Sequence, residues 1–207
     1  MADNPVVILG ARRTPIGAFQ GVFSNAKATD LGAAAVAAAV GDAGVDPARV
    51  DEAIMGCVLP AGLGQAPARQ AALGGGLPVG VSCTTVNKMC GSGMKAIMQA
   101  HDGIAAGSAG TVVAGGLESM TNAPYLLPKA RSGYRMGHQE VLDHMFTDGL
   151  QDVYEGHMMG HFAENTAEKY GFTRDEQDAF AIESVTRAQN GVANGDFANE
   201  ITPVTFP

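Results

Sequence analysis

Charged side chains are scarce in this sequence. They make up 16% of its 207 residues, whereas hydrophobic residues make up 46%. This balance favours a compact globular protein with a large buried fraction. The formal net charge of −8 argues against a nucleic-acid partner, because nucleic-acid-binding proteins present a clustered basic face.

Cysteine is also rare, with three residues at positions 57, 83 and 90. Three cysteines do not make a disulfide framework, and no Cys-x-x-Cys spacing is present, so we expect no metal site. The N-terminus lacks the basic start and the long apolar run of a signal peptide. No stretch is apolar for long enough to span a bilayer. We therefore expect a cytoplasmic protein without a membrane partner.

Short apolar runs alternate with helical patterns over the first 116 residues. The predicted strands lie at residues 5–10, 53–58, 81–87 and 111–115. Thr29-Asp30 is the expected N-cap of an alanine-rich helix that ends near Gly41 or Gly44, and further helices are predicted at 66–73 and 89–106. The alternation predicts βαβ units, which form a mostly parallel sheet with helices on both faces.

The pattern changes after residue 116. Residues 117–172 are richer in Met, His, Tyr and Pro and show no obvious strand. Thr173 and Glu176 form a capping-box pattern that opens an amphipathic helix, expected to end near Gly191 or Gly195. Residues 201–207 read as an apolar strand. Because such a strand needs neighbours, we expect that the protein is cut short or continued by another chain.

The turn around Cys90 has the features of a nucleophile site. The pattern predicts a strand, a tight turn and a helix that Cys90 begins. Unpaired N–H groups at a helix N-terminus stabilise a thiolate and an oxyanion. Gly91 and Gly93 lack a Cβ, so a substrate can approach the sulfur. The local sequence leaves a second reading open, a small buried hydrophobic Cys, and this inert reading is the one expected for Cys57 and Cys83.

The segment from Asn87 to Ala96, NKMCGSGMKA, resembles the nucleophile motif of the thiolase family. The resemblance continues at residues 12–17, 115–125, 163–167 and 173–178. It covers the chain from the first strand almost to residue 207, and it corresponds to the N-terminal half of a thiolase.

The resemblance implies an α/β fold, namely one βαβ-rich half of the layered α-β-α-β-α thiolase core. This half would occupy residues 1–117 and carry Cys90. Residues 118–207 would form an incomplete, mainly helical loop domain that faces CoA. The C-terminal half of the core would be absent from the chain.

The resemblance also implies acetyl-CoA C-acyltransferase activity. Cys90 would take an acyl group as a thioester, converting two acetyl-CoA to acetoacetyl-CoA and CoA or catalysing the reverse reaction. Two-step transfer predicts ping-pong kinetics. The backbone N–H of Cys90 would form half of an oxyanion hole. The expected substrates are coenzyme A thioesters, with no tightly bound cofactor.

Several parts of the thiolase catalytic set are missing from the sequence. The family's Gly-His-Pro histidine, its second cysteine and its Asn-Glu-Ala motif belong to the C-terminal domain. We therefore expect a complementary C-terminal thiolase half as partner, in a dimer or tetramer. His101 lies too far along its helix to reach the sulfur of Cys90. His138 and His144 are expected to be exposed to solvent.

The expected substrate contacts lie in the loop domain. Many relatives carry His-Met-Gly where this chain has Met158-Met159-Gly160, with His157 one place earlier. Either His157 points into the pantetheine channel or an apolar lining of Met158 and Met159 replaces it, and both methionines could equally be core residues. Leu150 is expected to line the same pocket.

Two other functions remain open at this point. The chain could be a non-catalytic fragment or scaffold that keeps the fold without turnover. It could also be a condensing enzyme of the ketoacyl-synthase type, which uses a similar cysteine on a helix. The loop-domain motifs favour a thiolase over a ketoacyl synthase. A Gly-His-Pro segment in a co-purifying chain would distinguish an enzyme from a scaffold.

Overall fold

The computed structural model describes residues 5–205, and its centre is a parallel three-stranded sheet in the order β2-β1-β3. The strands are β1 (Glu52–Gly56), β2 (Ser82–Val86) and β3 (Val112–Gly116). Glu52 pairs with Ser82 and Val112, and the register continues without a break to the end of all three strands. The three strands lie within two residues of their predicted positions, and the expected α/β class is confirmed.

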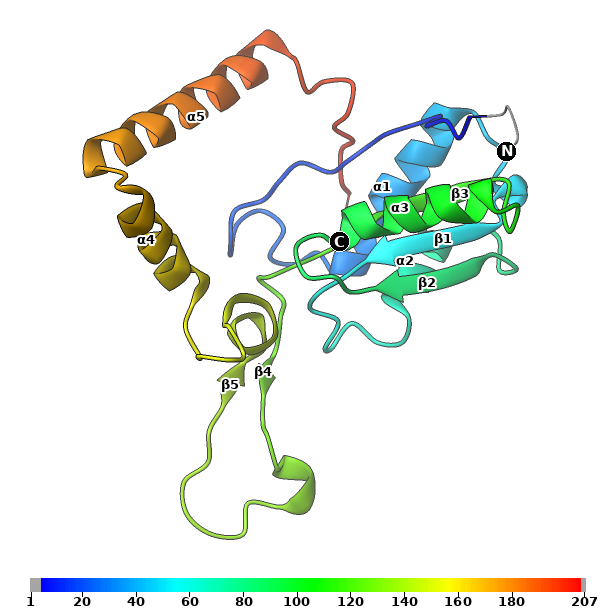
Figure 1. The fold of residues 1–207 in the computed structure, drawn as a ribbon. Helices are drawn as coiled ribbons and strands as arrows, with labels where there is room; N and C mark the ends of the chain where they lie inside the picture. Colours follow the sequence, from blue (N-terminus) through cyan, green and yellow to red (C-terminus); the bar gives the residue numbers. More distant parts are fainter. Residues whose placement is uncertain (1–4, 206–207) are drawn as a thin grey trace.

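Helices cover both faces of this sheet (Figure 1). They are α1 (Ala28–Ala43), α2 (Pro67–Gly74) and α3 (Ser92–Ala105), with a short 3-10 helix η1 (Pro47–Arg49) before β1. Helix α3 packs on β1 and β3, whereas α2 packs on β1 and β2 and is covered by α1. The hydrophobic core lies between the sheet and α1 and α2, where Ala68, Ala71 and Ala72 are fully buried. Small alanine side chains let these layers approach closely.

Helix α1 begins earlier than expected. Its N-cap is Lys27, which makes no side-chain capping bond, and the helix starts at Ala28. The predicted cap at Thr29-Asp30 is therefore wrong. Ala28 and Thr29 are both buried, so packing rather than capping sets this end. The predicted end is confirmed, because Gly44 closes the helix with a left-handed φ of 62°.

The predicted strand at residues 5–10 is wrong. This segment is extended but pairs with no other strand of the described chain, and the side chain of Ile8 is 80% exposed. A strand needs a neighbour to satisfy its backbone groups, and apolar character alone does not supply one.

The strand-like end of the chain meets the N-terminal segment at one point. Arg13 and Ile201 form an isolated parallel bridge, and the N–H of Thr202 donates to the Arg13 carbonyl at 2.8 Å. Residues 202–205 form no strand, and the last two residues of the predicted strand, 206 and 207, lie outside the described residues. The end of the chain therefore contacts the loop at Arg13, and no ladder forms there.

After residue 118 the chain leaves the core as a hairpin and an arm of two helices, and it returns to the core after α5 (Figure 1). Residues 118–205 form β4 (Tyr125–Leu126), the 3-10 helix η2 (Ala130–Ser132), β5 (Leu142–Asp143), the π-helix η3 (Phe146–Leu150), α4 (Met159–Tyr170) and α5 (Arg174–Asn194). β4 and β5 pair antiparallel as the base of a long hairpin. The expectation that this region holds no strand is therefore wrong, although each strand is only two residues long.

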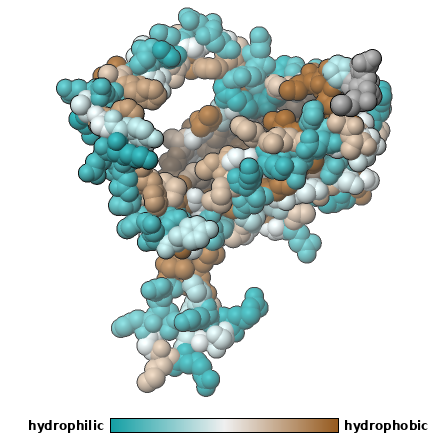
Figure 2. Space-filling model, in the orientation of Figure 1, coloured by the Kyte–Doolittle hydropathy of each residue, from teal (hydrophilic) through white to brown (hydrophobic). Residues whose placement is uncertain are grey.

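Helix α5 confirms the predicted capping box but stands apart from the core. The N–H of Thr173 donates to Glu176, the N–H of Glu176 donates to Thr173 Oγ1, and Gly195 closes the helix. Its apolar face is not buried: the side chain of Phe180 is 78% exposed. Figure 2 shows an opening between this arm and the core. Every described helix falls short, in length or in apolar character, of what crossing a membrane requires.

Candidate active site

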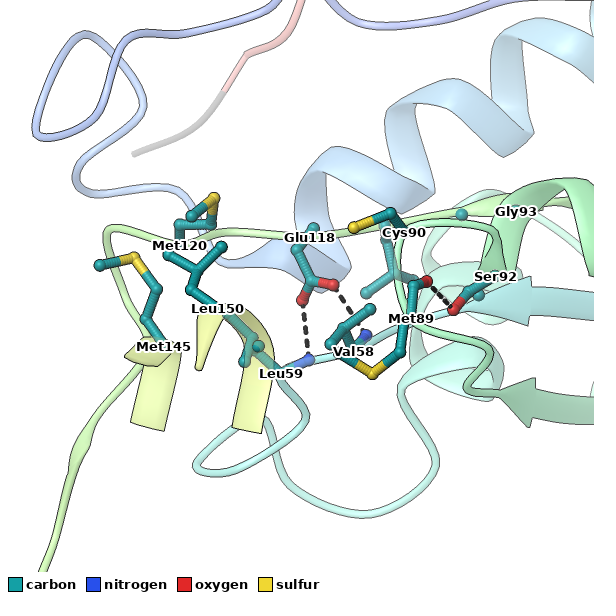
Figure 3. Close-up of a pocket in the computed structure, with 14 residues that line it drawn as sticks. Val58, Leu59, Met89, Cys90, Ser92, Gly93, Glu118, Met120, Met145 and Leu150 are labelled. Atoms are coloured by element: carbon teal, nitrogen blue, oxygen red, sulfur yellow. Dashed lines mark hydrogen bonds between the residues drawn. The ribbon is translucent and has the colours of Figure 1, made fainter. Parts of the chain in front are cut away.

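A cavity of about 400 Å³ lies where β1 and β3 end and the chain turns into α3. The carboxyl ends of parallel strands meet at the same edge of a sheet, which is where open α/β folds bind ligands. The walls are mostly apolar and come from four segments that are distant in the sequence (Figure 3). They include Leu59 after β1, Cys90 before α3, Glu118 and Met120 after β3, and Leu150 in η3.

Cys90 lies in the turn between β2 and α3, and its side chain is exposed at the cavity. The helix itself begins at Ser92, with Gly91 as its N-cap. The expectation that Cys90 begins the helix is therefore wrong by two residues. The cause is a tight turn, in which Gly91 N–H donates to Lys88 C=O and Ser92 N–H donates to Met89 C=O. This turn places the thiol beside the cavity before the helix starts.

Glycine at position 56 lets the start of α3 pack directly on the end of β1. A Cβ at Gly56 would lie 2.6 Å from the backbone N of Gly93 and 2.7 Å from Cβ of Ser92. No real side chain tolerates such contacts with backbone atoms, so only glycine fits there. The position of the Cys90 turn relative to the sheet is therefore fixed by backbone packing.

Cys57 follows β1 directly and is 2% exposed. Its burial, together with the charge of Glu118 beside it, raises the pKa of the thiol to about 12. Burial likewise raises the pKa of Cys83, which lies in β2. The predicted raised pKa is confirmed for both cysteines, whereas full burial is confirmed for Cys57 alone, because Cys83 is half-buried. Cys57 lies one residue beyond its strand.

Glu118 is the charged residue in the cavity wall, and sequence reasoning did not single it out. Its carboxylate accepts the N–H groups of Val58 at 2.7 Å and Leu59 at 3.1 Å (Figure 3). The carboxylate also lies 3.6 Å from Sγ of Cys57. It therefore ties the segment after β3 to the segment after β1. The available signal was a lone carboxylate two residues after an apolar strand, in a chain with so few charges.

The structure places only one of the expected substrate contacts at the cavity. Leu150 lines it together with Cys90. His157 is exposed, and its ring stacks 4.1 Å from that of His161. Met158 is the half-buried N-cap of α4, and Met159 is the first residue of that helix. These last three residues do not line the cavity, so their contact with substrate stays a prediction.

The histidines differ from one another in burial. His138 is exposed as expected, and His101, for which no exposure was predicted, is exposed too. His144 is only 4% exposed, so the expectation of a solvated side chain is wrong for it. It is held between the hairpin base and η3, because its backbone N–H donates to Pro124 C=O and its ring Nδ1 lies 2.6 Å from Asp148 Oδ2. No cluster of three His, Cys, Asp or Glu side chains suited to a metal ion occurs within residues 5–205.

Comparison with known proteins agrees with this geometry. The family model for the thiolase N-terminal domain matches residues 6–207. An acetyl-CoA acetyltransferase of Pseudomonas aeruginosa is 50% identical over 202 residues, which cover 98% of this chain and 51% of that protein. A probable acetyl-CoA acyltransferase of Staphylococcus aureus is 48% identical, and an acetyl-CoA acetyltransferase of Cupriavidus necator is 50% identical, both with the same coverage. The chain spans about half the length of the curated relatives it matches. On its fold, its motif around Cys90 and these matches, the chain belongs to the thiolase family.

Proposed function

We propose that this chain carries the nucleophile of an acyl-CoA C-acyltransferase, and that Cys90 is that nucleophile. One observation carries the proposal. Of the three cysteines, all within the described residues, Cys90 is exposed and lines the cavity, whereas Cys57 is buried and Cys83 half-buried. A covalent catalyst needs a thiolate that its substrate can reach.

The proposed reaction proceeds in two steps. The Cys90 thiolate attacks the carbonyl carbon of acetyl-CoA, a new C–S bond to Sγ forms, and the bond to CoA sulfur breaks, so that CoA leaves as a thiolate. The α-carbon of a second acetyl-CoA then loses a proton and attacks the acetyl-enzyme. Acetoacetyl-CoA is released and the Cys90 thiolate is regenerated. In the reverse direction, acetoacetyl-CoA is cleaved by CoA through the same thioester.

The composition of the cavity supports an acyl substrate. Leu59, Met120, Met145 and Leu150 give it apolar walls, which suit the acyl end of a thioester. Among the described residues that line it, Glu118 is the only ionisable group besides the thiol, and two backbone N–H groups already occupy its oxygens. The groups that move protons from Cys90 and from the α-carbon must therefore come from outside this cavity wall.

A complementary C-terminal thiolase half is the proposed source of those groups. Exposed apolar faces support this partner: Met94, Ile97 and Met98 on the outer side of α3 are each about half exposed or more. Burying such a face is favourable, and monomeric proteins rarely leave it open. We assign residues 1–117 to the core half and residues 118–207 to the loop domain, in a dimer or tetramer.

An exchange experiment tests the covalent step alone. Intact protein, with whatever second half accompanies the chain, is incubated with acetyl-CoA and isotopically labelled free CoA, without any other acyl acceptor. The proposal predicts label in acetyl-CoA, because the acetyl-enzyme forms and reverses without a second acetyl-CoA. A protein that forms acetoacetyl-CoA but shows no exchange would contradict the proposed thioester.

A further inference from the structure

The turn that carries Cys90 is held by two side chains that the proposed chemistry does not use. Ser92 is 4% exposed, and its Oγ accepts the N–H of Lys88 at 2.8 Å and donates to the carbonyl of Met89. The carbonyl of Met89 belongs to the peptide bond that leads into Cys90. Asn87 Oδ1 accepts the N–H of Met89 at 2.9 Å. Three backbone groups of the turn are therefore fixed by side chains.

The backbone at Met89 needs this support. Its φ is 49°, in the left-handed region that side-chain-bearing residues rarely adopt. Such a conformation costs free energy and persists only where the surroundings hold it in place. The hydrogen bonds from Ser92 and Asn87 act on the N–H and the carbonyl of this one residue. Releasing them would let Met89 relax and would turn the peptide that orients Cys90.

Ser92 is itself fixed by the sheet. Its Cβ lies where a side chain on Gly56 would otherwise be, so the hydroxyl has a defined position relative to the end of β1. Asn87 adds a second tie, because its Nδ2 lies 3.5 Å from the carbonyl of Val58 in the segment after β1. Ser92 and Asn87 therefore link the sheet to the Met89–Cys90 peptide, Ser92 through its hydrogen bond to the Met89 carbonyl (Figure 3) and Asn87 through its bond from the Met89 N–H.

We propose that Ser92 and Asn87 are positioning residues that hold the Met89–Cys90 peptide in its left-handed turn and so aim the Cys90 thiol at the cavity. This inference rests on the proposed role of Cys90 as nucleophile. Neither side chain needs to touch the substrate for this role. Both act through the backbone that precedes the reacting sulfur.

The chain contains the same local motif at a second place, which gives a matched control. Lys129 has a φ of 64°, and Ser132, three residues later, donates both its N–H and its hydroxyl to the Lys129 carbonyl. This copy lies in the hairpin, is exposed and does not line the cavity. Ser132→Ala therefore removes the same hydrogen bond as Ser92→Ala, away from Cys90.

The test uses two readouts in the intact protein, including any second half. The first is the rate at which iodoacetamide alkylates Cys90 between about pH 6 and about pH 10, measured by peptide mass spectrometry. The second is kcat and KM for cleavage of acetoacetyl-CoA by CoA. Ser92→Ala is expected to lower kcat about tenfold to a hundredfold with little change in KM, and to alter the pH profile of alkylation. Ser92→Thr, which keeps the hydroxyl, should recover most of the loss, and Ser132→Ala should match the unmodified protein.

A second pair of variants covers the case in which Ser92→Ala fails to fold. Asn87 is exposed, so Asn87→Ala leaves no cavity in the core; it removes the acceptor for Met89 N–H and the donor to the Val58 carbonyl, and should lower kcat in the same way. Asn87→Asp keeps the acceptor for Met89 N–H. An unaltered kcat and an unaltered alkylation profile in the folded alanine variants would overturn the inference. Alkylation reports on the thiol without turnover. Activity that survives Cys90→Ala would therefore reject the proposed function separately.

Discussion

Cys57 and Cys90 lie at the same edge of the sheet but in opposite environments. Cys57 follows β1 without a turn, is buried, and has a carboxylate 3.6 Å from its sulfur. Cys90 follows β2 after a turn and is exposed at a cavity. The end of a parallel strand is therefore not sufficient to make a nucleophile. The difference in exposure comes from the turn before α3, which places the side chain of Cys90 outside the packed layer between the sheet and its helices.

Glu118 adds to the difference between the two cysteines. Its charge and its hydrogen bond raise the pKa of Cys57 further, after burial as the larger cause. The same carboxylate ties Val58 and Leu59 to the cavity wall. One acidic side chain thus adds to the raised pKa of Cys57 while it shapes the pocket that Cys90 faces.

The largest expected effect is the loss of Cys90. Cys90→Ala should lower kcat for acetoacetyl-CoA cleavage about a million-fold, as removal of a covalent nucleophile does. Cys83→Ala is the matched control and should retain activity, because burial already raises the pKa of Cys83 and its thiol does not line the cavity. Equal losses in the two variants would remove the distinction between the cysteines.

Adding one methyl group at Gly56 should displace the turn without touching either thiol. Gly56→Ala is expected to cost about 1–3 kcal/mol in the free energy of unfolding, because its Cβ would overlap the backbone of Ser92 and Gly93. Urea denaturation measures this cost. Gly103→Ala, in helix α3 and facing open space, should be neutral or slightly stabilising. A Gly56→Ala protein as stable as the Gly103→Ala protein would contradict the packing described for α3.

Alkaline pH should destabilise the fold through Cys57. The pKa of this thiol is about 12 in the folded protein and 9.0 ordinarily, so the folded state keeps its proton longer. Its contribution is fully present below pH 9.0 and is lost as the pH rises through about 12. The stability difference between the unmodified protein and Cys57→Ala should therefore shrink over this window. Urea denaturation at several pH values checks this, and a difference that stays constant would contradict the raised pKa.

The smallest expected effect comes from Glu118. Glu118→Gln removes the charge that faces Cys57 but keeps an oxygen acceptor for the segment after β1. The pKa of Cys57 should fall but stay above 9.0, because burial, the larger cause, is unchanged. The pH dependence of thiolate absorbance in the ultraviolet, in a variant that retains Cys57 as its one cysteine, measures this shift. If the pKa of Cys57 is the same in Glu118→Gln, burial alone raises it and the charge of Glu118 contributes nothing.

The sequence predicted the centre of the fold well, and the reason is physical. β1, β2 and β3 are apolar or β-branched runs, and each pairs with a neighbouring strand of the same sheet, so local pattern and tertiary structure agree. The segment at residues 5–10 has the same pattern and forms no strand, because no partner strand lies beside it among the described residues. The apolar character of a segment predicts its preference for an extended, buried conformation. It does not predict whether a partner strand lies beside it.

The candidate site was predicted in part. Cys90 and Leu150 line the same cavity. Both could be singled out beforehand, because each lies in a short segment whose local sequence resembles a family motif. Ser92 and Glu118 were not singled out, since their roles depend on backbone groups that only the folded chain brings together. His144 shows the same limit: its burial depends on the contact between the hairpin base and η3, which no local pattern encodes.

Intact mass spectrometry with acetyl-CoA tests the central claim most directly. The protein is mixed with acetyl-CoA, weighed intact, and then digested to locate any adduct. The account predicts the mass of one acetyl group, mapped to the peptide that contains Cys90 and absent from Cys90→Ala. A protein that turns over acetyl-CoA while its acetyl group maps to another residue, or to none, would contradict it.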